Sequence, residues 1–395
     1  KEMISKKVSE NLGKSSWIRA MFEEGEKLRK IYGPEKVYDF SLGNPEVEPP
    51  ASVKETMKSI LLSDKPGIHR YMSNAGYDSV RAKVAEYLAK EKGVPLSPEN
   101  IIMTCGAAGG LNVVLKTILD PGDEVIVFSP YFVEYLFYID NHGGKPVILP
   151  TEKDTFQPDP ELMERNLKPN TKAIILNSPN NPTGVIYSEE ILSRMADIIS
   201  EKEKEYNTHI FVISDEPYDK IVYDNAVVPS IFRIFKNSII VNSFSKSLAL
   251  PGERIGYIAV NSRIENVKLL VNGLVFSNRI LGFVNAPALF QKVVADSLNE
   301  AVDIESYKEK RDILYNHLVK LGFSCVKPQG AFYLFPKALI DDDVEFAKRA
   351  VKYNLLIVPG SGFGYPGYFR LSYCINKETI INSLPAFEAL VKEFK

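Results

Sequence analysis

Cysteine, histidine and tryptophan are scarce in this chain, and no long apolar run occurs. The 395 residues include three cysteines, four histidines and one tryptophan. Cys105, Cys325 and Cys374 lack the spacing of a metal site or a disulfide framework, and the histidines are equally scattered. No segment reaches the apolar length of a membrane span, and the polar stretch 1–13 lacks a signal-peptide core. We therefore expect no metal and a soluble, cytoplasmic protein.

An excess of charge of one sign is also lacking. Lysine and arginine number 48 against 50 aspartate and glutamate residues, giving a net charge of −2 with the two signs mixed along the chain. A nucleic-acid partner is therefore not expected, because the chain has no basic footprint. A membrane partner is not expected because no segment is apolar over the length of a membrane span. Hydrophobic residues make up 45% of the chain, enough to bury a large core and to form about two domains.

Strand-like and helix-like segments alternate, as in βαβ units of a mainly parallel sheet. The fold class predicted is therefore α/β. Strands are expected at 101–103, 124–128, 146–149, 173–176, 210–213, 238–241, 257–260 and 368–373. Helical spacing is clearest at 79–91, 189–200 and 301–321, and a further helix is expected at 111–119.

The run from Ser243 to Arg254 places one amine among hydroxyl groups and close to an arginine. Lys246 follows Ser243 and Ser245, and Arg254 lies eight residues further on. An amine can form a Schiff base with a carbonyl compound, and pyridoxal phosphate is a carbonyl compound that also carries a phosphate. Ser243, Ser245 and Arg254 are candidates for holding that phosphate while Lys246 holds the aldehyde carbon. Alone, the run also fits a solvated surface lysine.

Two polar segments follow strand-like runs. Asp215 and Tyr218 come directly after the apolar run 210–213, at the edge of a parallel sheet where ligands bind. A carboxylate there can keep a pyridine nitrogen protonated, and Tyr218 can donate to a ring hydroxyl. Asp215 can equally cap a following helix. The loop 177–184 contains two prolines and a glycine, which exclude a helix. It can aim Asn181 at a ring oxygen and Asn177 at a substrate carboxylate.

These motifs and their order resemble those of the aminotransferase class I and II family of fold-type-I pyridoxal-phosphate enzymes. The order is Asn-x-Pro-x-Asn-Pro-Thr-Gly, then Asp-x-x-Tyr, then Ser-x-Ser-Lys with a later arginine. The resemblance runs from about Ser41 to Arg370. It implies a large cofactor domain with a mainly parallel central sheet and a small α+β domain built from both chain ends. We place an N-terminal arm and part of the small domain at 1–48, the large domain at 49–282 and the rest of the small domain at 283–395.

The resemblance assigns further residues. The small-residue loop 104–110 precedes a helix, where backbone amides bind anions, so Ala107 and Ala108 are the implied phosphate donors. Phe132 would stack on the pyridine ring. Tyr71 resembles a tyrosine that reaches the phosphate of the neighbouring subunit, which implies a homodimer with shared active sites.

Substrate binding is implied at two further positions. Arg370 resembles the arginine that grips the substrate α-carboxylate, a task suited to a planar double donor. Gly43 resembles the residue whose backbone amide meets the other carboxylate oxygen. The run 362–367 matches the letters of a dinucleotide fingerprint, but it contains a proline and precedes a strand, so nicotinamide binding is not expected.

The chemistry implied is transfer of an amino group from an L-amino acid to a 2-oxo acid by a ping-pong mechanism, through a Schiff base on Lys246. Asp215 would support the protonated ring. A carbon–sulfur β-lyase or an aminocyclopropane-carboxylate synthase on the same scaffold would use the same residues. A non-catalytic sensor of this fold would carry a DNA-binding domain, and no basic helix-turn-helix pattern precedes Gly43.

The amino donor is left open. Relatives specific for dicarboxylates use a second cation, and this chain has Ala108 at one of the implied positions and Arg279 only near the other. Aromatic, branched or other neutral donors fit as well as aspartate. Trp17, Phe22 and Tyr32 either line the substrate entrance or pack an N-terminal helix.

Overall fold

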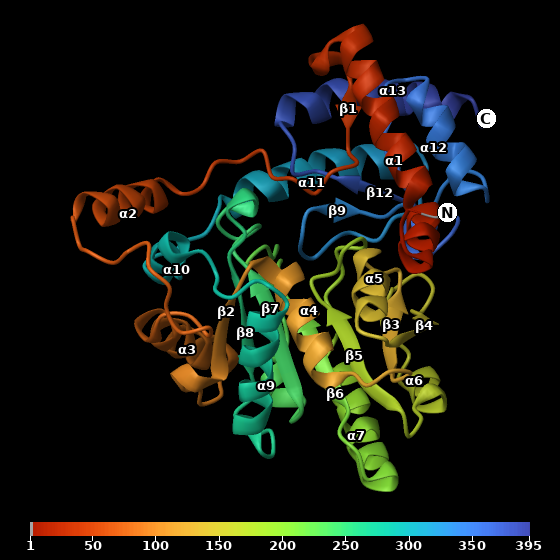
Figure 1. Ribbon diagram of the computed structural model, residues 1–395. Coiled ribbons are helices and arrows are strands. Elements are labelled where there is room, and N and C mark those ends of the chain that lie inside the picture. The colour runs from red at the N-terminus through yellow and green to blue at the C-terminus, as the bar shows by residue number, and fades with distance from the viewer. Residues whose placement is uncertain (1–2) are drawn as a thin grey trace.

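The computed structural model describes residues 3–395, apart from the side chains of residues 16–18. Within this part the chain forms two domains that lie one above the other (Figure 1). The helices are α1 (Lys6–Tyr32), α2 (Ala51–Leu62), α3 (Asp78–Lys92), α4 (Gly106–Ile118), α5 (Glu134–Asn141), α6 (Pro160–Asn166), α7 (Glu189–Tyr206), α8 (Ile231–Ile234), α9 (Val267–Ile280), α10 (Ala288–Ala295), α11 (Ile304–Lys320), α12 (Asp343–Val351) and α13 (Lys377–Lys392). The strands are β1 (Tyr38–Asp39), β2 (Ile101–Thr104), β3 (Glu124–Ser129), β4 (Lys145–Pro150), β5 (Thr171–Asn177), β6 (Phe211–Asp215), β7 (Ser238–Ser243), β8 (Gly256–Val260), β9 (Tyr333–Leu334), β10 (Leu355–Leu356), β11 (Val358–Pro359) and β12 (Phe369–Ser372).

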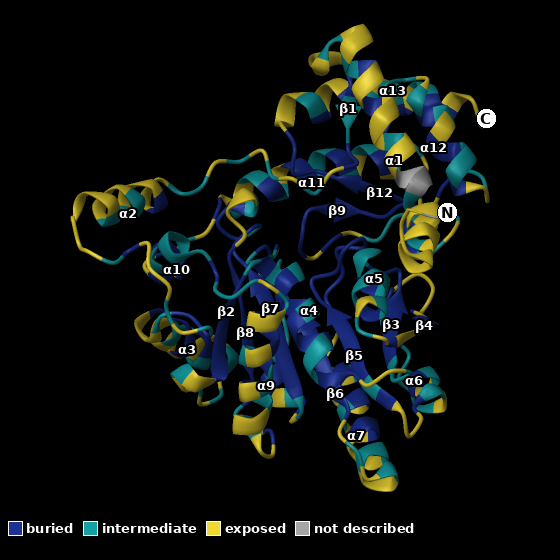
Figure 2. Cartoon of the chain, in the orientation of Figure 1, coloured by how far each residue is buried: buried dark blue, intermediate teal, exposed yellow. Residues whose placement is uncertain are grey.

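A seven-stranded sheet organises the large domain, in the order β2-β8-β7-β6-β5-β3-β4. Its strands are parallel except β8, which runs antiparallel to both β2 and β7. Helices cover both faces of the sheet, so its inner strands are nearly continuous apolar runs and are almost fully buried (Figure 2). The edge strand β4 is largely exposed. The predicted α/β class and the mainly parallel sheet are confirmed.

The small domain contains both chain ends. In Figure 1 the red N-terminal helix α1, the teal helix α11 and the blue helices α12 and α13 lie together above the sheet. Strand β1 pairs with β10, and β12 pairs with β9 and β11. The core of this domain contains Phe40 from the N-terminal part and Tyr307, Phe346 and Phe387 from the C-terminal part. Both ends are needed to bury one apolar core, so neither forms a domain alone.

Helix α10 lies beyond the join predicted at Gly282, and its packing bears on where the second domain begins. Helix α10 packs against α2 and α3, and its Val293 and Val294 share a core with Val53 and Val84. From this packing we propose a join near Val302, just before α11, in place of the one predicted at Gly282. The sequence gives no signal for this, because α10 is apolar enough to fit either domain.

The predicted strands agree with the structure within two residues. Of the predicted helices, α4 begins five residues earlier than expected and α7 ends six residues later. The helix expected at 301–321 begins at Ile304, because Asp303 caps it and accepts a hydrogen bond from the Ser306 amide. The run 362–367 is a turn that leads into strand β12, as predicted. None of the described helices is long and apolar enough to cross a membrane.

Candidate active site

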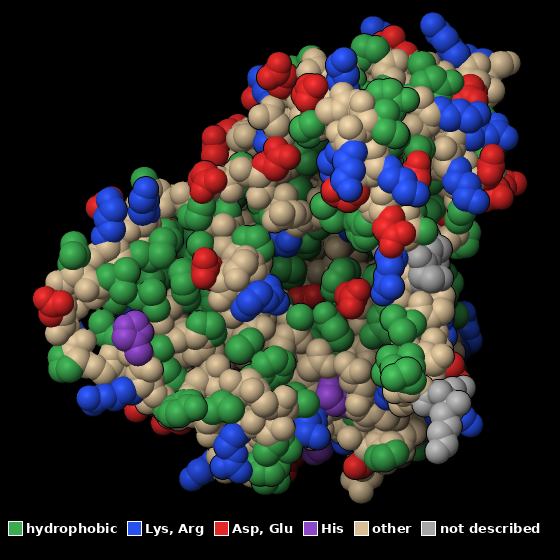
Figure 3. All heavy atoms as spheres, turned by 45° about the horizontal axis from the view of Figure 1, so that its top comes forward, with side chains coloured by type: hydrophobic (Ala, Val, Ile, Leu, Met, Phe, Trp, Pro, Cys, Tyr) green, Lys and Arg blue, Asp and Glu red, His purple; other side chains and the backbone are tan. Residues whose placement is uncertain are grey.

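A cavity of about 430 Å³ lies at the carboxyl edge of the central sheet, below the small domain. The space-filling view shows the surface hollowed between the two domains (Figure 3). Asn177, Asp215 and Ser243 are the last residues of the neighbouring strands β5, β6 and β7, so the sheet itself brings them side by side. The site residues predicted from the sequence that line the cavity are Gly43, Ala107, Ala108, Phe132, Asn177, Asn181, Asp215, Tyr218, Ser243, Ser245, Lys246, Arg254 and Arg370.

Tyr71 is the exception. It lies in the loop between α2 and α3, with 90% of its side chain exposed, and it does not line this cavity. Phe22 of α1 lines the cavity, whereas Tyr32 at the end of α1 is exposed. The Trp17 side chain lies outside the described residues.

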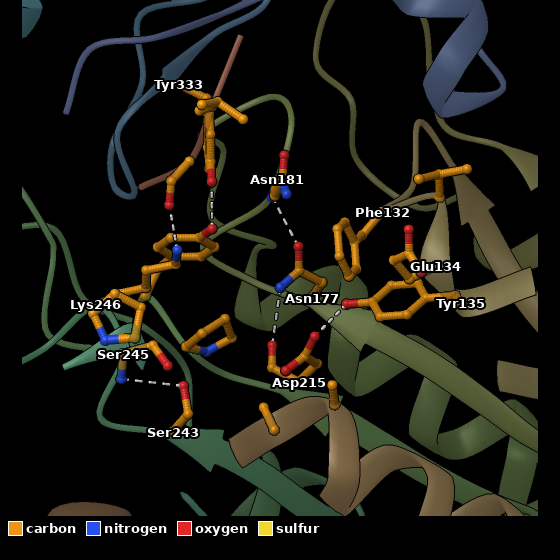
Figure 4. Close-up of a pocket in the computed structure, with 18 of the residues that line it drawn as sticks. Phe132, Glu134, Tyr135, Asn177, Asn181, Asp215, Ser243, Ser245, Lys246 and Tyr333 are labelled. Carbon is orange, nitrogen blue, oxygen red and sulfur yellow. Dashed lines mark hydrogen bonds between the residues drawn. The ribbon is translucent and has the colours of Figure 1, made fainter. Parts of the chain in front are cut away.

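Lys246 follows strand β7 and extends across the cavity. Its Nζ donates a hydrogen bond to the carbonyl oxygen of Gly43 (Figure 4). Burial is the main reason that the pKa of this amine is lowered to about 8; Cys374 opposes the shift, and Arg370 and Arg254 contribute to it. An amine with this pKa is partly neutral near physiological pH. Lys246 therefore has the chemical character of a nucleophile or a general base.

Asp215 has one satisfied and one unsatisfied oxygen. Its Oδ2 accepts a hydrogen bond of 2.5 Å from the Tyr135 hydroxyl (Figure 4). Its Oδ1 is buried and has no hydrogen-bond partner among the described residues. Burial raises the pKa of Asp215 to about 7, although the Tyr135 hydrogen bond lowers it and Glu216 adds to the rise. A cationic N–H at Oδ1 would satisfy this atom and stabilise the carboxylate.

A cradle for an anion lies at the start of helix α4. The amides of Ala107 and Ala108 lie in its first turn, and no described side chain caps this helix end. The guanidinium of Arg254 packs on Gly106, where an added Cβ would lie 2.6 Å from Nη2. The hydroxyl groups of Ser243 and Ser245 line the same cavity. Amides, hydroxyls and a cation at one place suit a phosphate group.

The loop after β5 is fixed by the Asn177 side chain. Asn177 Nδ2 donates to the carbonyl oxygen of Asp215 at 3.0 Å, and its Oδ1 accepts from the Asn181 amide at 2.8 Å. Both ends of the amide thus bind protein atoms, which differs from the expectation that Asn177 is aimed at a substrate carboxylate. In the structure Asn177 instead orients Asn181.

Arg370 on β12 points down from the small domain into the cavity. It donates from Nη1 to Asn181 Oδ1 at 2.9 Å and from Nη2 to the carbonyl oxygen of Ser41 at 2.7 Å. Its Nε is buried without a partner among the described residues, and none of their carboxylates forms an ion pair with it. Its guanidinium lies against the Tyr333 and Phe363 rings. A buried, uncompensated guanidinium is suited to a carboxylate ligand.

Several cavity residues were not found from the sequence. The Tyr135 hydroxyl is the hydrogen-bond donor to Asp215. Its place in the sequence, three residues after Phe132, does not indicate this contact. The Phe132 and Tyr135 rings meet edge to face at 5.5 Å. The Tyr333 hydroxyl lies 2.5 Å from that of Tyr218, which we expected to contact a cofactor hydroxyl. Long-range contacts of this kind leave no spacing pattern in a sequence.

Comparisons with known proteins agree with this geometry. The family model for aminotransferase class I and II matches residues 35–386. A probable aspartate/prephenate aminotransferase of Aquifex aeolicus is 35% identical over 371 residues, covering 90% of this chain and 91% of that protein. Aromatic-amino-acid aminotransferase 2 of Thermococcus litoralis is 32% identical over 387 residues, covering 93% and 96%. The crystal structure of an aminotransferase from Eubacterium rectale matches with a TM-score of 0.96 at 40% identity, and the match covers 100% of both chains.

The fold and the cavity, together with these likenesses, define a fold-type-I transferase. The chain belongs to the aminotransferase class I and II family, whose enzymes use pyridoxal phosphate. It is an aminotransferase, as the sequence predicted.

Proposed function

We propose that this cavity binds pyridoxal phosphate and that the enzyme moves an amino group from an L-amino acid to a 2-oxo acid through Lys246. The observation that carries the proposal is the unpartnered Oδ1 of Asp215, a residue that lines the same cavity as the anion cradle of α4. A pyridinium N–H fits the first and a phosphate fits the second, and Lys246 lines the same cavity. When bound, the cofactor supplies an electron-withdrawing ring that stabilises negative charge on the amino-acid α-carbon.

The residues of the chain then divide the work. Lys246 Nζ would hold the aldehyde carbon, and its pKa of about 8 suits the amine to accept the α-proton of the substrate. Asp215 holds the ring nitrogen protonated. Arg370 binds the α-carboxylate and so fixes the α-carbon within reach of Lys246. Phe132 covers one face of the ring and limits its movement.

The first experiment follows the visible absorbance of the cofactor-loaded protein while amino acids are added one at a time. A band that is lost with a donor and restored by a 2-oxo acid supports transamination and names the donor. A band that persists while pyruvate and ammonia accumulate from a cysteine conjugate indicates a β-lyase instead.

The attachment point is tested without turnover. Borohydride treatment of the loaded protein followed by peptide mass mapping is expected to find the cofactor on the peptide that contains Lys246. Lys246→Ala is expected to lose both the label and the band. Lys220→Ala is the matched control, because burial also lowers the pKa of Lys220, which lies outside the cavity. A label on another lysine, or a band in Lys246→Ala, would refute the assignment.

The homodimer and its shared site are part of the same proposal. Tyr71 is 90% exposed and Leu62 of α2 is 79% exposed, and large exposed apolar groups favour burial by another subunit. We place Tyr71 against the phosphate in the partner's cavity. Light scattering checks the dimer. If the site is shared, mixed dimers of Lys246→Ala and Tyr71→Ala chains recover activity that neither variant has alone. The unpaired cysteines among the described residues agree with a cytoplasmic setting.

A further inference from the structure

Glu134 is a carboxylate inside the cavity that the chemistry above does not use. It is the first residue of α5, it is half-buried, and it lines the cavity beside Phe132. Figure 4 shows Glu134 on the Phe132 side of the cavity, away from Lys246. No described residue forms a hydrogen bond or ion pair with its side chain. Burial raises the pKa of its carboxyl, with no nearby cation to oppose the rise.

The charges of the cavity can be assigned one by one. Its cationic lining residues in the described chain are Lys246, Arg254 and Arg370. Each has a task, since Lys246 takes the reacting carbon, Arg254 takes the phosphate and Arg370 takes the α-carboxylate. Of the two carboxylates, Asp215 takes the ring nitrogen.

Among the described residues that line the cavity, Glu134 is the one charged residue to which no role has been assigned. The side chain of the amino donor is likewise the one part of the substrate and cofactor to which no charged residue has been assigned. A second carboxylate on the substrate would meet Glu134 with no cation from this chain to compensate. Like charges in a cavity of low dielectric repel more strongly than in water.

We propose that Glu134 selects the amino donor, accepting side chains that end in a cation or a hydrogen-bond donor and disfavouring a second carboxylate. The inference rests on the proposed function, because it assumes that Arg370 and Arg254 are occupied as described. It narrows the substrate class to basic and neutral polar amino acids. Specificity then comes from the Glu134 carboxylate, which repels a second carboxylate on the substrate and accepts hydrogen bonds from a cationic or neutral polar side chain.

The test uses donor pairs of equal shape that differ in one charge. Asparagine and aspartate form one pair, and glutamine and glutamate form another. For the wild type we expect kcat/KM to be at least about tenfold higher for the amide of each pair, which corresponds to about 1.4 kcal/mol. In Glu134→Gln, which keeps the shape and removes the charge, the ratio is expected to fall by about tenfold or more.

The matched control is Glu161→Gln, the same change on an exposed glutamate of α6 that does not line the cavity. This variant is expected to keep the wild-type ratio. A second readout avoids turnover: calorimetry of succinate and its monoamide on the cofactor-loaded protein. The wild type is expected to bind the monoamide more tightly, and Glu134→Gln to close this gap.

The outcomes separate the two proposals. A cofactor-loaded protein that transaminates, with amide-to-acid ratios equal in the wild type and Glu134→Gln, overturns the role of Glu134 alone. A protein that takes up no cofactor, or that shows no transfer with any donor, overturns the proposed function. A wild type that prefers aspartate and glutamate over their amides also refutes the selection, whatever the variant does.

Discussion

Replacing Tyr135 with phenylalanine is expected to raise the pH at which Asp215 ionises. The Tyr135 hydroxyl is the hydrogen-bond donor to Oδ2, and Oδ1 has no partner among the described residues, so the variant leaves both oxygens unsatisfied. A hydrogen bond to a charged group contributes about 1.5–3 kcal/mol. Since one pH unit corresponds to about 1.4 kcal/mol, the titration midpoint of Asp215 is expected to rise by about 1–2 pH units above its wild-type pKa of about 7.

The same change alters how stability depends on pH in the cofactor-free protein. Burial places the folded-state pKa of Asp215 at about 7, above its ordinary value of 3.8, so the folded state binds the proton more tightly than the unfolded state. The contribution of this group to stability is therefore full below pH 3.8, falls as pH rises through 7 and is constant above that. The total fall is about 4 kcal/mol for the wild type. In Tyr135→Phe the fall is expected to continue for about 1–2 further pH units.

Infrared spectroscopy of the protonated carboxyl group gives the midpoint, and urea unfolding at a series of pH values gives the stability. Tyr187→Phe is the control, because this buried hydroxyl accepts from Asn180 and does not contact Asp215. A midpoint in Tyr135→Phe equal to or below that of the wild type would refute the role given to Tyr135. So would an equal shift in Tyr187→Phe.

Two further changes test the ends of the cavity. Arg370→Lys replaces a guanidinium that donates two hydrogen bonds by a point charge. The KM for the amino-acid substrate is therefore expected to rise about 10–100-fold, a larger factor than the fall in kcat. An unchanged KM in steady-state kinetics would contradict carboxylate binding by Arg370. Gly43→Ala would place a Cβ 2.5 Å from the Tyr333 hydroxyl and displace the carbonyl that Lys246 contacts, so cofactor affinity is expected to fall about tenfold. Fluorescence titration measures this loss. Adding Tyr333→Phe removes the clash, and a double variant no better than Gly43→Ala would rule out this cause.

The sequence predicted those parts of the site that strand order determines. Asn177, Asp215 and Ser243 each follow an apolar run, and parallel strands place their carboxyl ends at one edge, so their meeting was foreseeable. The donor to Asp215 was not, because Tyr135 lies 80 residues away on a helix whose register the sequence does not fix. The same holds for the contact of Arg370 with Ser41, which are 329 residues apart. The packing of α10 on the large domain is likewise a tertiary choice that local pattern leaves open.

The hydrogen bonds from Arg370 to Asn181, from Asn181 to Asn177 and from Asn177 to Asp215 form one continuous chain across the cavity. This series of hydrogen bonds fixes the distance between Arg370, the proposed contact of the substrate carboxylate, and Asp215, the proposed contact of the cofactor ring. The substrate side chain plays no part in setting that distance. The α-carboxylate that every amino acid carries is therefore bound by residues outside α5. The residues of α5 that line the cavity can change without altering these contacts. A substitution at a position such as Glu134 can therefore change which amino donor the enzyme accepts, while the residues that carry out the reaction stay the same.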